Sequence, residues 1–191
     1  MILSDLTGVV LAGGLSRRMG VDKASLMVGD RTLVRRAVDR LVTAGCDPVV
    51  VLHRRPEELT DVGVPIHADL EGGPGPLDGI ITALTIAPTS VVVTVPVDLP
   101  RFDHTDIGRL IAELENDSDL DVVVATDPFG RDQHLAAAWR REPCLTRLVQ
   151  AFEDGERAVR RAIVGLVAGR SVVASDHLLN LNTPADLEAD L

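Results

Sequence analysis

The sequence has few of the residues that recognise nucleic acids. Its 191 residues include three Phe, one Trp and no Tyr, so aromatic side chains make up only 2% of the chain. Single-strand binding proteins stack bases on such side chains. Basic residues number 19 against 29 acidic ones, which gives a formal net charge of −10 and a pI of about 4.8. Because this charge repels phosphate backbones, we expect no nucleic-acid partner.

The sequence also lacks an apolar run long enough for a membrane-spanning helix. Its longest runs, such as residues 90–97, fall far short of about 20 residues, and no signal-peptide pattern opens the chain. We therefore expect a cytoplasmic protein with no membrane partner. The two cysteines, Cys46 and Cys144, have neither Cys-x-x-Cys nor Cys/His metal spacing. We interpret both as small apolar residues rather than as a disulfide or a zinc site.

What is present is the composition of one globular domain. The chain is 46% hydrophobic and 25% charged, and its length is usual for a single domain with a full core. We see no linker, internal repeat or low-complexity tract that would divide it. The sequence therefore predicts one domain over residues 1–191.

Apolar periodicity predicts strands that alternate with helices. Buried strands are predicted over 7–12, 49–52, 65–68, 91–95 and 122–125, and helices over 32–44, 76–87 and 107–114. Residues 91–95 are almost purely β-branched, which favours a central strand covered on both faces. Such alternation implies right-handed crossovers and a mostly parallel central sheet. We therefore expect a three-layer αβα fold.

The pattern changes after residue 127. A strand is predicted over 135–139, helices over 144–152 and 158–166, and a short edge strand at 172–173. Pro184, with Thr183 as its cap, is predicted to begin the final helix.

The most informative segment is a glycine loop with the sequence LAGGLSRRMGVDK, residues 11–23. Its glycines allow backbone N–H groups to approach an anion, Arg17 and Arg18 supply forked donors, and Lys23 supplies a compact charge. The loop contains no Gly-x-Gly-x-x-Gly, and Gly20 is not followed by Lys-Ser/Thr, which disfavours NAD and P-loop sites. A solvated strand-to-helix connection is the alternative. It does not explain why the one lysine of the chain lies here, so we predict a phosphate-rich ligand.

This loop resembles the signature of the molybdenum cofactor guanylyltransferases, the MobA-like nucleotidyltransferases. The resemblance continues over nearly the whole chain, through Gly73-Pro-Gly-Pro-Leu77, Pro96-Val-Asp-Leu-Pro100, Asp154-Gly-Glu-Arg157 and Asn180-Leu-Asn-Thr-Pro184. It implies a Rossmann-like nucleotidyltransferase fold that uses Mg²⁺ to transfer GMP from GTP to molybdenum-bound molybdopterin. A CTP-dependent relative, an enzyme acting on another phosphorylated small molecule, and a non-catalytic nucleotide-binding module are the alternatives.

The resemblance also assigns the site residues. It implies that Arg18, Lys23 and Asp98 are catalytic and that Asp98 binds the metal. The nucleotide contacts that it implies are Leu11, Ala12, Gly13, Gly14, Lys23, Asp69 and Asp98. Asn180 and Asn182 would share one face of an extended segment and could bind the polar acceptor, although ordinary turn chemistry before the final helix is an alternative. Contacts with proteins that deliver molybdopterin or accept the product are expected to be transient.

Physical reasoning supports some of these assignments and leaves others open. Asp98 follows the most apolar predicted strand, at the edge where parallel sheets bind ligands, although a turn or helix cap is an alternative. Asp69 could accept hydrogen bonds from guanine N1–H and N2–H₂. Leu52 stands where relatives can have asparagine, so that polar contact is either missing or taken over by His53 or the backbone. The basic side chains Arg157, Arg160 and Arg161 could meet a pterin phosphate or form a solvated face.

Overall fold

The computed structural model describes residues 5–13, 22–60, 62–69 and 75–181. A seven-stranded sheet with the order β5-β4-β1-β6-β8-β7-β9 forms its centre. The strands are β1 (Leu6–Leu11), β4 (Val49–His53), β5 (Ile66–Ala68), β6 (Val91–Pro96), β7 (Val122–Thr126), β8 (Asp132–Arg140) and β9 (Ala168–Val172). All run parallel except β8, which is antiparallel to both of its neighbours. A small hairpin of β2 (Met27–Val28) and β3 (Arg31–Thr32) was not predicted.

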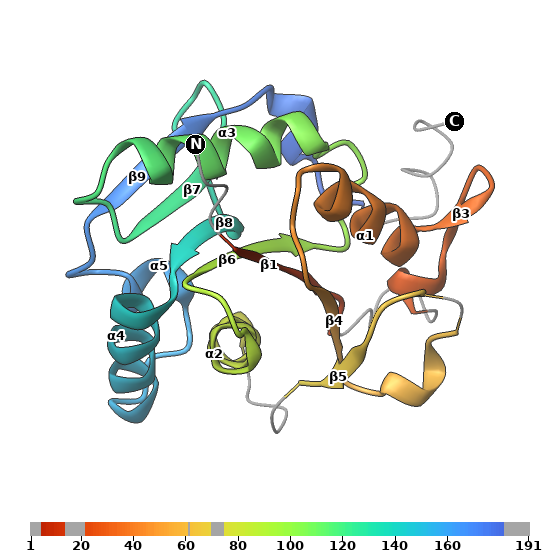
Figure 1. Ribbon diagram of the computed structural model, residues 1–191, viewed down its shortest axis with the longest axis horizontal. Helices are drawn as coiled ribbons and strands as arrows, with labels where there is room; N and C mark the ends of the chain where they lie inside the picture. Colours follow the sequence, from red (N-terminus) through yellow and green to blue (C-terminus); the bar gives the residue numbers. More distant parts are fainter. Residues whose placement is uncertain (1–4, 14–21, 61, 70–74, 182–191) are drawn as a thin grey trace.

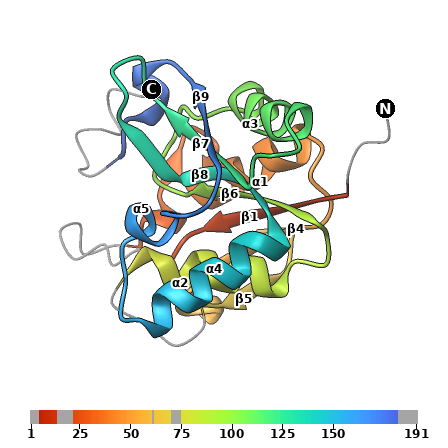
Figure 2. The same ribbon diagram turned by 90° about the vertical axis from the view of Figure 1, so that its left-hand side faces the viewer.

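Helices cover both faces of this sheet, as Figures 1 and 2 show from two directions. On one face lie α1 (Leu33–Thr43) and α3 (His104–Asn116), and on the other lie α2 (Pro76–Ile86), α4 (Arg141–Glu153) and the short α5 (Val159–Ala162). Each face has its own apolar core, because successive strand residues point to opposite sides. In β1, for example, Val9 packs on the α2 side and Val10 on the α1 side. The predicted three-layer αβα fold is therefore confirmed.

Strand β6 is buried along its whole length, which confirms the expectation of a central strand covered on both faces. Its one hydroxyl, on Thr94, lies in the core and is satisfied there. Thr94 Oγ1 donates to the carbonyl of Leu135 at 2.9 Å and accepts from Trp139 Nε1 at 2.9 Å. A buried hydroxyl that makes both bonds avoids most of its desolvation cost.

The order of the strands creates a switch point between β1 and β6. From β1 the chain continues to β4 and β5 on one side, and then crosses to β6 on the other side of β1. Open α/β sheets bind ligands outside the carboxyl ends of their strands at such a point. Two further backbone hydrogen bonds hold the strand ends together there, from Val97 N to Leu11 O at 3.1 Å and from Ala12 N to Leu52 O at 2.9 Å.

Two predictions after residue 127 were wrong in their bounds. The helix expected over 158–166 ends at Ala162, and Gly165 follows with a φ of 101°, which a right-handed helix cannot contain. The last strand runs over Ala168–Val172 rather than 172–173, although it does lie at the edge of the sheet. Its sequence, AGRSV, has no apolar alternation, and its pairing with β7 decides its course. The final helix predicted at Pro184 lies outside the described residues.

Among the helices in the described part of the chain, none combines the length and the apolar character needed to cross a membrane.

Candidate active site at the switch point

Asp98 and Lys23 meet beyond the end of β6. Asp98 comes two residues after that strand, and Lys23 begins a 3-10 turn over Lys23–Ser25 that closes the glycine loop. Lys23 Nζ lies 3.6 Å from Asp98 Oδ2, and the two side chains are only 17% and 24% exposed. Burial raises the pKa of the Asp98 carboxyl, and the neighbouring lysine opposes this shift. The structure thus joins the two residues that the sequence analysis ranked as the metal ligand and the phosphate-binding cation.

Asp22 and His53 fix the turn that carries Lys23. Asp22 Oδ1 caps the turn by accepting from Ala24 N at 3.1 Å. Asp22 Oδ2 is a buried oxygen that lies 3.1 Å from His53 Nε2, although the two are not aligned as a good hydrogen bond. The other ring nitrogen of His53 contacts the backbone of Arg55. Because both ring nitrogens face protein atoms, His53 supports the loop rather than offering a nitrogen to a ligand.

Asp69 packs closely against Gly13. It follows β5, and its Oδ2 lies 2.9 Å from where a Cβ at Gly13 would be, so a side chain at Gly13 would collide with it. Its other oxygen, Oδ1, is buried without a hydrogen-bond partner among the described residues. Burial, and then the charge of Asp78, raise the pKa of Asp69, whereas Arg54 and a hydrogen bond with Thr82 lower it. Burying a carboxylate oxygen that has no donor of its own costs free energy.

Leu52 offers no polar group to this site. Its side chain is 1% exposed and belongs to the core on the α2 side. Sequence reasoning missed Arg54, which follows β4 directly and reaches the same corner as Gly13 and Asp69. The signal that could have found it is strand alternation, because residues 52 and 54 are two apart and so share a face.

The segment at Asn180 lies next to Asp98 in space, although about 80 residues separate the two along the chain. The N–H of Leu181 donates to the carbonyl of Asp98 at 2.8 Å, which holds the chain at residue 180 against the end of β6. The carbonyl of the Asn180 side chain accepts from Gln133 Nε2 at 3.3 Å. Gln133, in β8, is a second residue of this corner that sequence reasoning missed.

A cavity of about 470 Å³ opens next to Gln133. Gly75 and Pro76 at the start of α2 form one part of its wall, and the basic residues Arg157, Arg160 and Arg161 form another, together with His134. Burial, the largest cause, lowers the pKa of His134, while Asp132 opposes the shift. The three arginines, for which a pterin phosphate and a solvated face were both left open, are therefore gathered at one cavity.

The Asp154-Gly-Glu-Arg157 segment joins this cavity to the start of α2. Glu156 accepts from the N–H groups of Arg157 and Ala158 at 2.7 and 2.8 Å, and it pairs with Arg161. Arg157 lies over the ring of Phe152 and donates to that residue's carbonyl at 2.8 Å. A Cβ at Gly75 would lie 2.9 Å from the Arg157 carbonyl oxygen, so the two segments touch only because residue 75 is glycine.

Another group of metal-binding residue types, away from Asp98, is occupied by its own contacts. Ligand atoms of Asp103, Asp106 and His177 lie within 4.8 Å of one another. Asp103 and Asp106 form a capping box at the start of α3, and His177 Nδ1 lies 2.6 Å from Asp106 Oδ2. The two aspartates therefore cap α3, and the contact of His177 with Asp106 attaches the segment that leads to Asn180 to the start of that helix.

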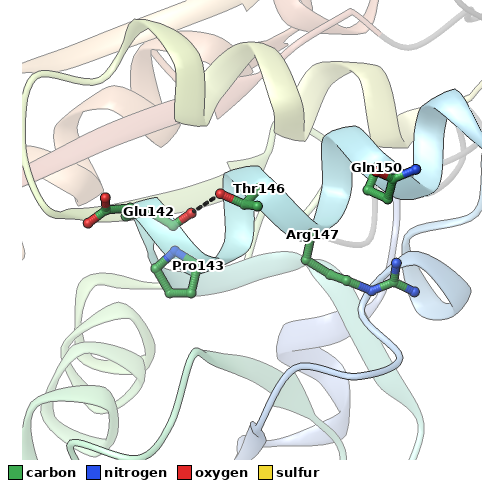
Figure 3. A pocket seen from close by; sticks show the side chains of 5 residues that line it. All are labelled: Glu142, Pro143, Thr146, Arg147 and Gln150. Atoms are coloured by element: carbon green, nitrogen blue, oxygen red, sulfur yellow. Dashed lines mark hydrogen bonds between the residues drawn. The ribbon is translucent and has the colours of Figure 1, made fainter.

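A second hollow, of about 620 Å³, lies on the outer surface of α4. Figure 3 shows its five lining side chains along that helix: Glu142, Pro143, Thr146, Arg147 and Gln150. Helix α4 starts near the amino end of β6, away from the strand ends that carry Asp98. There the N–H of Arg141 donates to the carbonyl of Ser90, the residue before β6. None of the predicted site residues lines this hollow.

Some predicted residues lie outside the described part of the chain. They are Gly14, Arg17, Arg18 and Asn182. Of the described residues, Leu11, Ala12, Gly13, Asp69 and Asp98 lie at the carboxyl ends of strands or within two residues of them. Lys23 and Asn180 are brought to Asp98 by the contacts given above. The N–H of Ala12 is already donated to Leu52, so Gly13 is the first described loop residue whose N–H could turn to a ligand.

Known proteins resemble this chain in sequence and in fold. The chain is 34% identical over 194 residues to the molybdenum cofactor guanylyltransferase of Sinorhizobium fredii, covering 94% of this chain and 88% of that one. In fold it is similar to the molybdopterin-guanine dinucleotide biosynthesis protein A of Archaeoglobus fulgidus, with a TM-score of 0.76, 20% identity and 96% of each chain covered. It is also similar in fold to the 2-C-methyl-D-erythritol 4-phosphate cytidylyltransferase of Thermus thermophilus, with a TM-score of 0.71, 16% identity and 95% of each chain covered.

The family model that matches this chain is the MobA-like NTP transferase domain, and the match covers residues 8–170. This range contains the last four residues of β1, the glycine loop, Asp98 and the cavity residues of β8 and α5. Together with the curated relative, it shows that the chain belongs to the MobA-like NTP transferase family.

Proposed function

We propose that this protein transfers GMP from GTP to the phosphate of molybdenum-bound molybdopterin, forming the guanine dinucleotide cofactor and releasing pyrophosphate. The observation that carries the proposal is the contact of Lys23 with Asp98 at the switch point between β1 and β6. A lysine suited to phosphate and a carboxylate suited to a divalent cation lie together there, just beyond the ends of the strands. The name of the curated relative supports the choice of guanylyl transfer and of this acceptor.

The residues at this point fit a magnesium ion. Asp98 presents a hard oxygen ligand, and burial makes its negative charge costly unless a cation lies nearby. Mg²⁺ commonly takes one or two protein carboxylates and completes its coordination with water and phosphate oxygens, so one aspartate is sufficient. When bound to Asp98, the ion would neutralise charge on the phosphate oxygens of the nucleotide.

The reaction requires little general acid–base catalysis from the protein, because the attacking group is already an ionised phosphate. A phosphate oxygen of the acceptor attacks the α-phosphorus of GTP, the bond from that phosphorus to the bridging oxygen breaks, and pyrophosphate leaves with the electron pair. Lys23 donates to the phosphate oxygens and offsets the charge that builds up on the leaving group. Its attachment to the capped turn at Asp22 keeps it in place before the substrate arrives. Holding the two substrates in line supplies much of the remaining rate enhancement.

Base choice is assigned to Asp69. Guanine offers N1–H and N2–H₂ as donors, and the unpaired Oδ1 of Asp69 is a matching acceptor. Cytosine offers an acceptor at N3 instead, so a carboxylate facing the base disfavours CTP. The acceptor side is assigned to Asn180 and to the cavity that holds Gln133, His134 and Arg160.

The experiment is an assay of pyrophosphate release with the purified protein, Mg²⁺ and molybdenum-bound molybdopterin. GTP, CTP and ATP are supplied in turn, and the nucleotide product is identified by mass spectrometry. We expect release with GTP to exceed release with the other two at least about tenfold, because unmatched buried polar groups cost about 1–3 kcal/mol each. Equal turnover of CTP would contradict the guanylyl assignment. Nucleotide binding without release in the presence of acceptor would indicate a non-catalytic binding module.

A further inference from the structure

Arg54 lies against the nucleotide end of the site. Its Cγ is 3.5 Å and its backbone N is 3.8 Å from the position that a Cβ at Gly13 would occupy, and Asp69 Oδ2 is 2.9 Å from the same position. The charge of Arg54 lowers the pKa of Asp69, against the effects of burial and of Asp78. A cation and a carboxylate therefore both pack against Gly13, the residue that begins the described end of the glycine loop.

The guanidinium of Arg54 also has unused hydrogen-bonding capacity. Its Nε is buried and has no hydrogen-bond partner among the described residues. The neighbouring Arg55 differs, since its side chain is 67% exposed and pairs with Glu58 at 2.5 Å. A buried donor without an acceptor costs free energy that a ligand oxygen would recover.

The direction of Arg54 follows from the strand that precedes it. Leu52 belongs to the core on the α2 side of the sheet, whereas His53 is turned to Asp22 on the other side. Two residues after Leu52, Arg54 returns to the α2 side, which is also where Asp69 and Gly79 lie. Arg54 is therefore the polar residue that β4 presents to this corner of the site.

We propose that Arg54 reads the base by donating a hydrogen bond to O6 of guanine while Asp69 accepts from N1–H and N2–H₂. The inference rests on the proposed function, because it takes the nucleotide to be GTP and Asp69 to face its base. Guanine carries the O6 acceptor directly beside the N1 donor, and an arginine next to an aspartate matches this order. Adenine and cytosine carry an amino donor in the place of O6, to which a guanidinium cannot donate.

The test compares three nucleotides with wild-type and variant protein. Calorimetric titration with GTP, ITP and ATP in the presence of Mg²⁺ measures the Kd of each. GTP and ITP both carry O6, and ATP does not. We expect Arg54→Met, which keeps the aliphatic length but removes the donors, to weaken GTP and ITP alike by about tenfold or more. The Kd of ATP should stay unchanged, so the preference for GTP over ATP shrinks by the same factor.

The matched control is Arg55→Met, which removes the same charge one residue further along the chain. It should leave all three Kd values unchanged. Thermal unfolding without nucleotide checks the fold of each variant. If Arg54→Met does not fold, Arg54→Lys is titrated instead, and we expect it to bind GTP more weakly than wild type while still preferring GTP over ATP.

Other outcomes would overturn the inference. An equal loss of affinity for GTP, ITP and ATP would place Arg54 on the ribose or the triphosphate, which all three share. An unchanged Kd for GTP would remove Arg54 from the site. If the wild-type protein neither binds GTP nor releases pyrophosphate from it, the proposed function itself is contradicted, and the inference about Arg54 falls with it. A protein that turns over GTP normally and is indifferent to Arg54→Met contradicts only this inference.

Discussion

The two ends of the candidate site are built in different ways. The proposed nucleotide end lies on the ends of β4, β1 and β6, which backbone hydrogen bonds hold together, and its charged pair, Lys23 and Asp98, is largely buried. The acceptor end is a cavity between β8 and the segment before α5, and its charges include the exposed side chains of Arg160 and Arg161. Charges interact more strongly where water is excluded. Substitutions at the nucleotide end should therefore have large effects, and those at the acceptor end small ones.

The largest effect is expected from Asp98→Asn. The amide keeps the shape of the side chain but loses the charge that would hold Mg²⁺, so turnover should fall by about 10²–10³-fold or more. Stability should stay unchanged or rise slightly, because burial raises the pKa of Asp98 and a carboxylate with a raised pKa opposes folding at neutral pH. Pyrophosphate release and the thermal midpoint are the two measurements. Wild-type turnover in this variant would place the metal elsewhere.

A smaller effect is expected from Lys23→Ala. Loss of a charged hydrogen bond to the triphosphate should weaken binding of GTP with Mg²⁺ by about 1.5–3 kcal/mol, measured by calorimetric titration. Because the chain has only one lysine, chemistry gives an independent check. An amine-acylating reagent can label Lys23 and the terminal amine, and bound GTP should protect Lys23 alone. Unchanged affinity together with unprotected labelling would contradict the assignment of this loop.

At the acceptor end, Arg160→Ala should act weakly and on the other substrate. An exposed charge pair contributes about 0.2–1 kcal/mol, so we expect the KM for molybdenum-bound molybdopterin to rise about two- to fivefold. The Kd of GTP should not change. Arg55→Ala, which removes an exposed arginine at the end of β4, is the control. A change in GTP affinity with an unchanged KM for the acceptor would contradict the assignment of Arg160 to the acceptor and place it near the nucleotide.

The smallest effect is expected on the free energy of unfolding at acidic pH, through Glu156. Hydrogen bonds, first from Arg161 and then from the N–H groups of Ala158 and Arg157, lower the pKa of Glu156 from 4.5 to about 2. A carboxylate whose pKa is lower in the folded state stabilises the fold above its unfolded pKa and loses this effect as the pH falls. The wild type should therefore lose this contribution between about pH 4.5 and pH 2.

The matched variant for this test is Glu156→Gln. Its urea midpoint should fall less than that of the wild type as the pH is lowered through the same window, since glutamine does not titrate. Parallel decline of the two proteins would mean that Glu156 does not support the segment before α5.

The sequence signals for the proposed nucleotide end are local. The β-branched run at 91–95, followed by Asp98, indicated a buried strand with a carboxylate at its end, and β6 confirms the strand. The isolated Lys23 indicated an anion site, and it does lie beside Asp98. The loss of a polar group at Leu52 was also visible, but its neighbour Arg54 was not considered, since its role depends on which face β4 turns toward Gly13.

The acceptor end was harder to predict because its parts are far apart in the chain. Gln133 gives no sequence signal, and it matters only because β8 and the segment at Asn180 lie side by side. The helix predicted through Gly165 was wrong because its periodicity continued past a residue with positive φ. The direction of β8 was not predicted either, since the apolar run at 135–139 does not distinguish an antiparallel strand from a parallel one.

By itself, the sequence determined the alternation of strands and helices, the layers they form and the two charged residues of the nucleotide end. Each of these depends on hydrophobic periodicity or on residue types within one short segment. Only the tertiary structure decided which strand ends meet, how His53 and Arg54 divide between the two faces of the sheet, and that Asn180 returns to Asp98. These features depend on hydrogen bonds and packing between residues tens of positions apart, which no local pattern records.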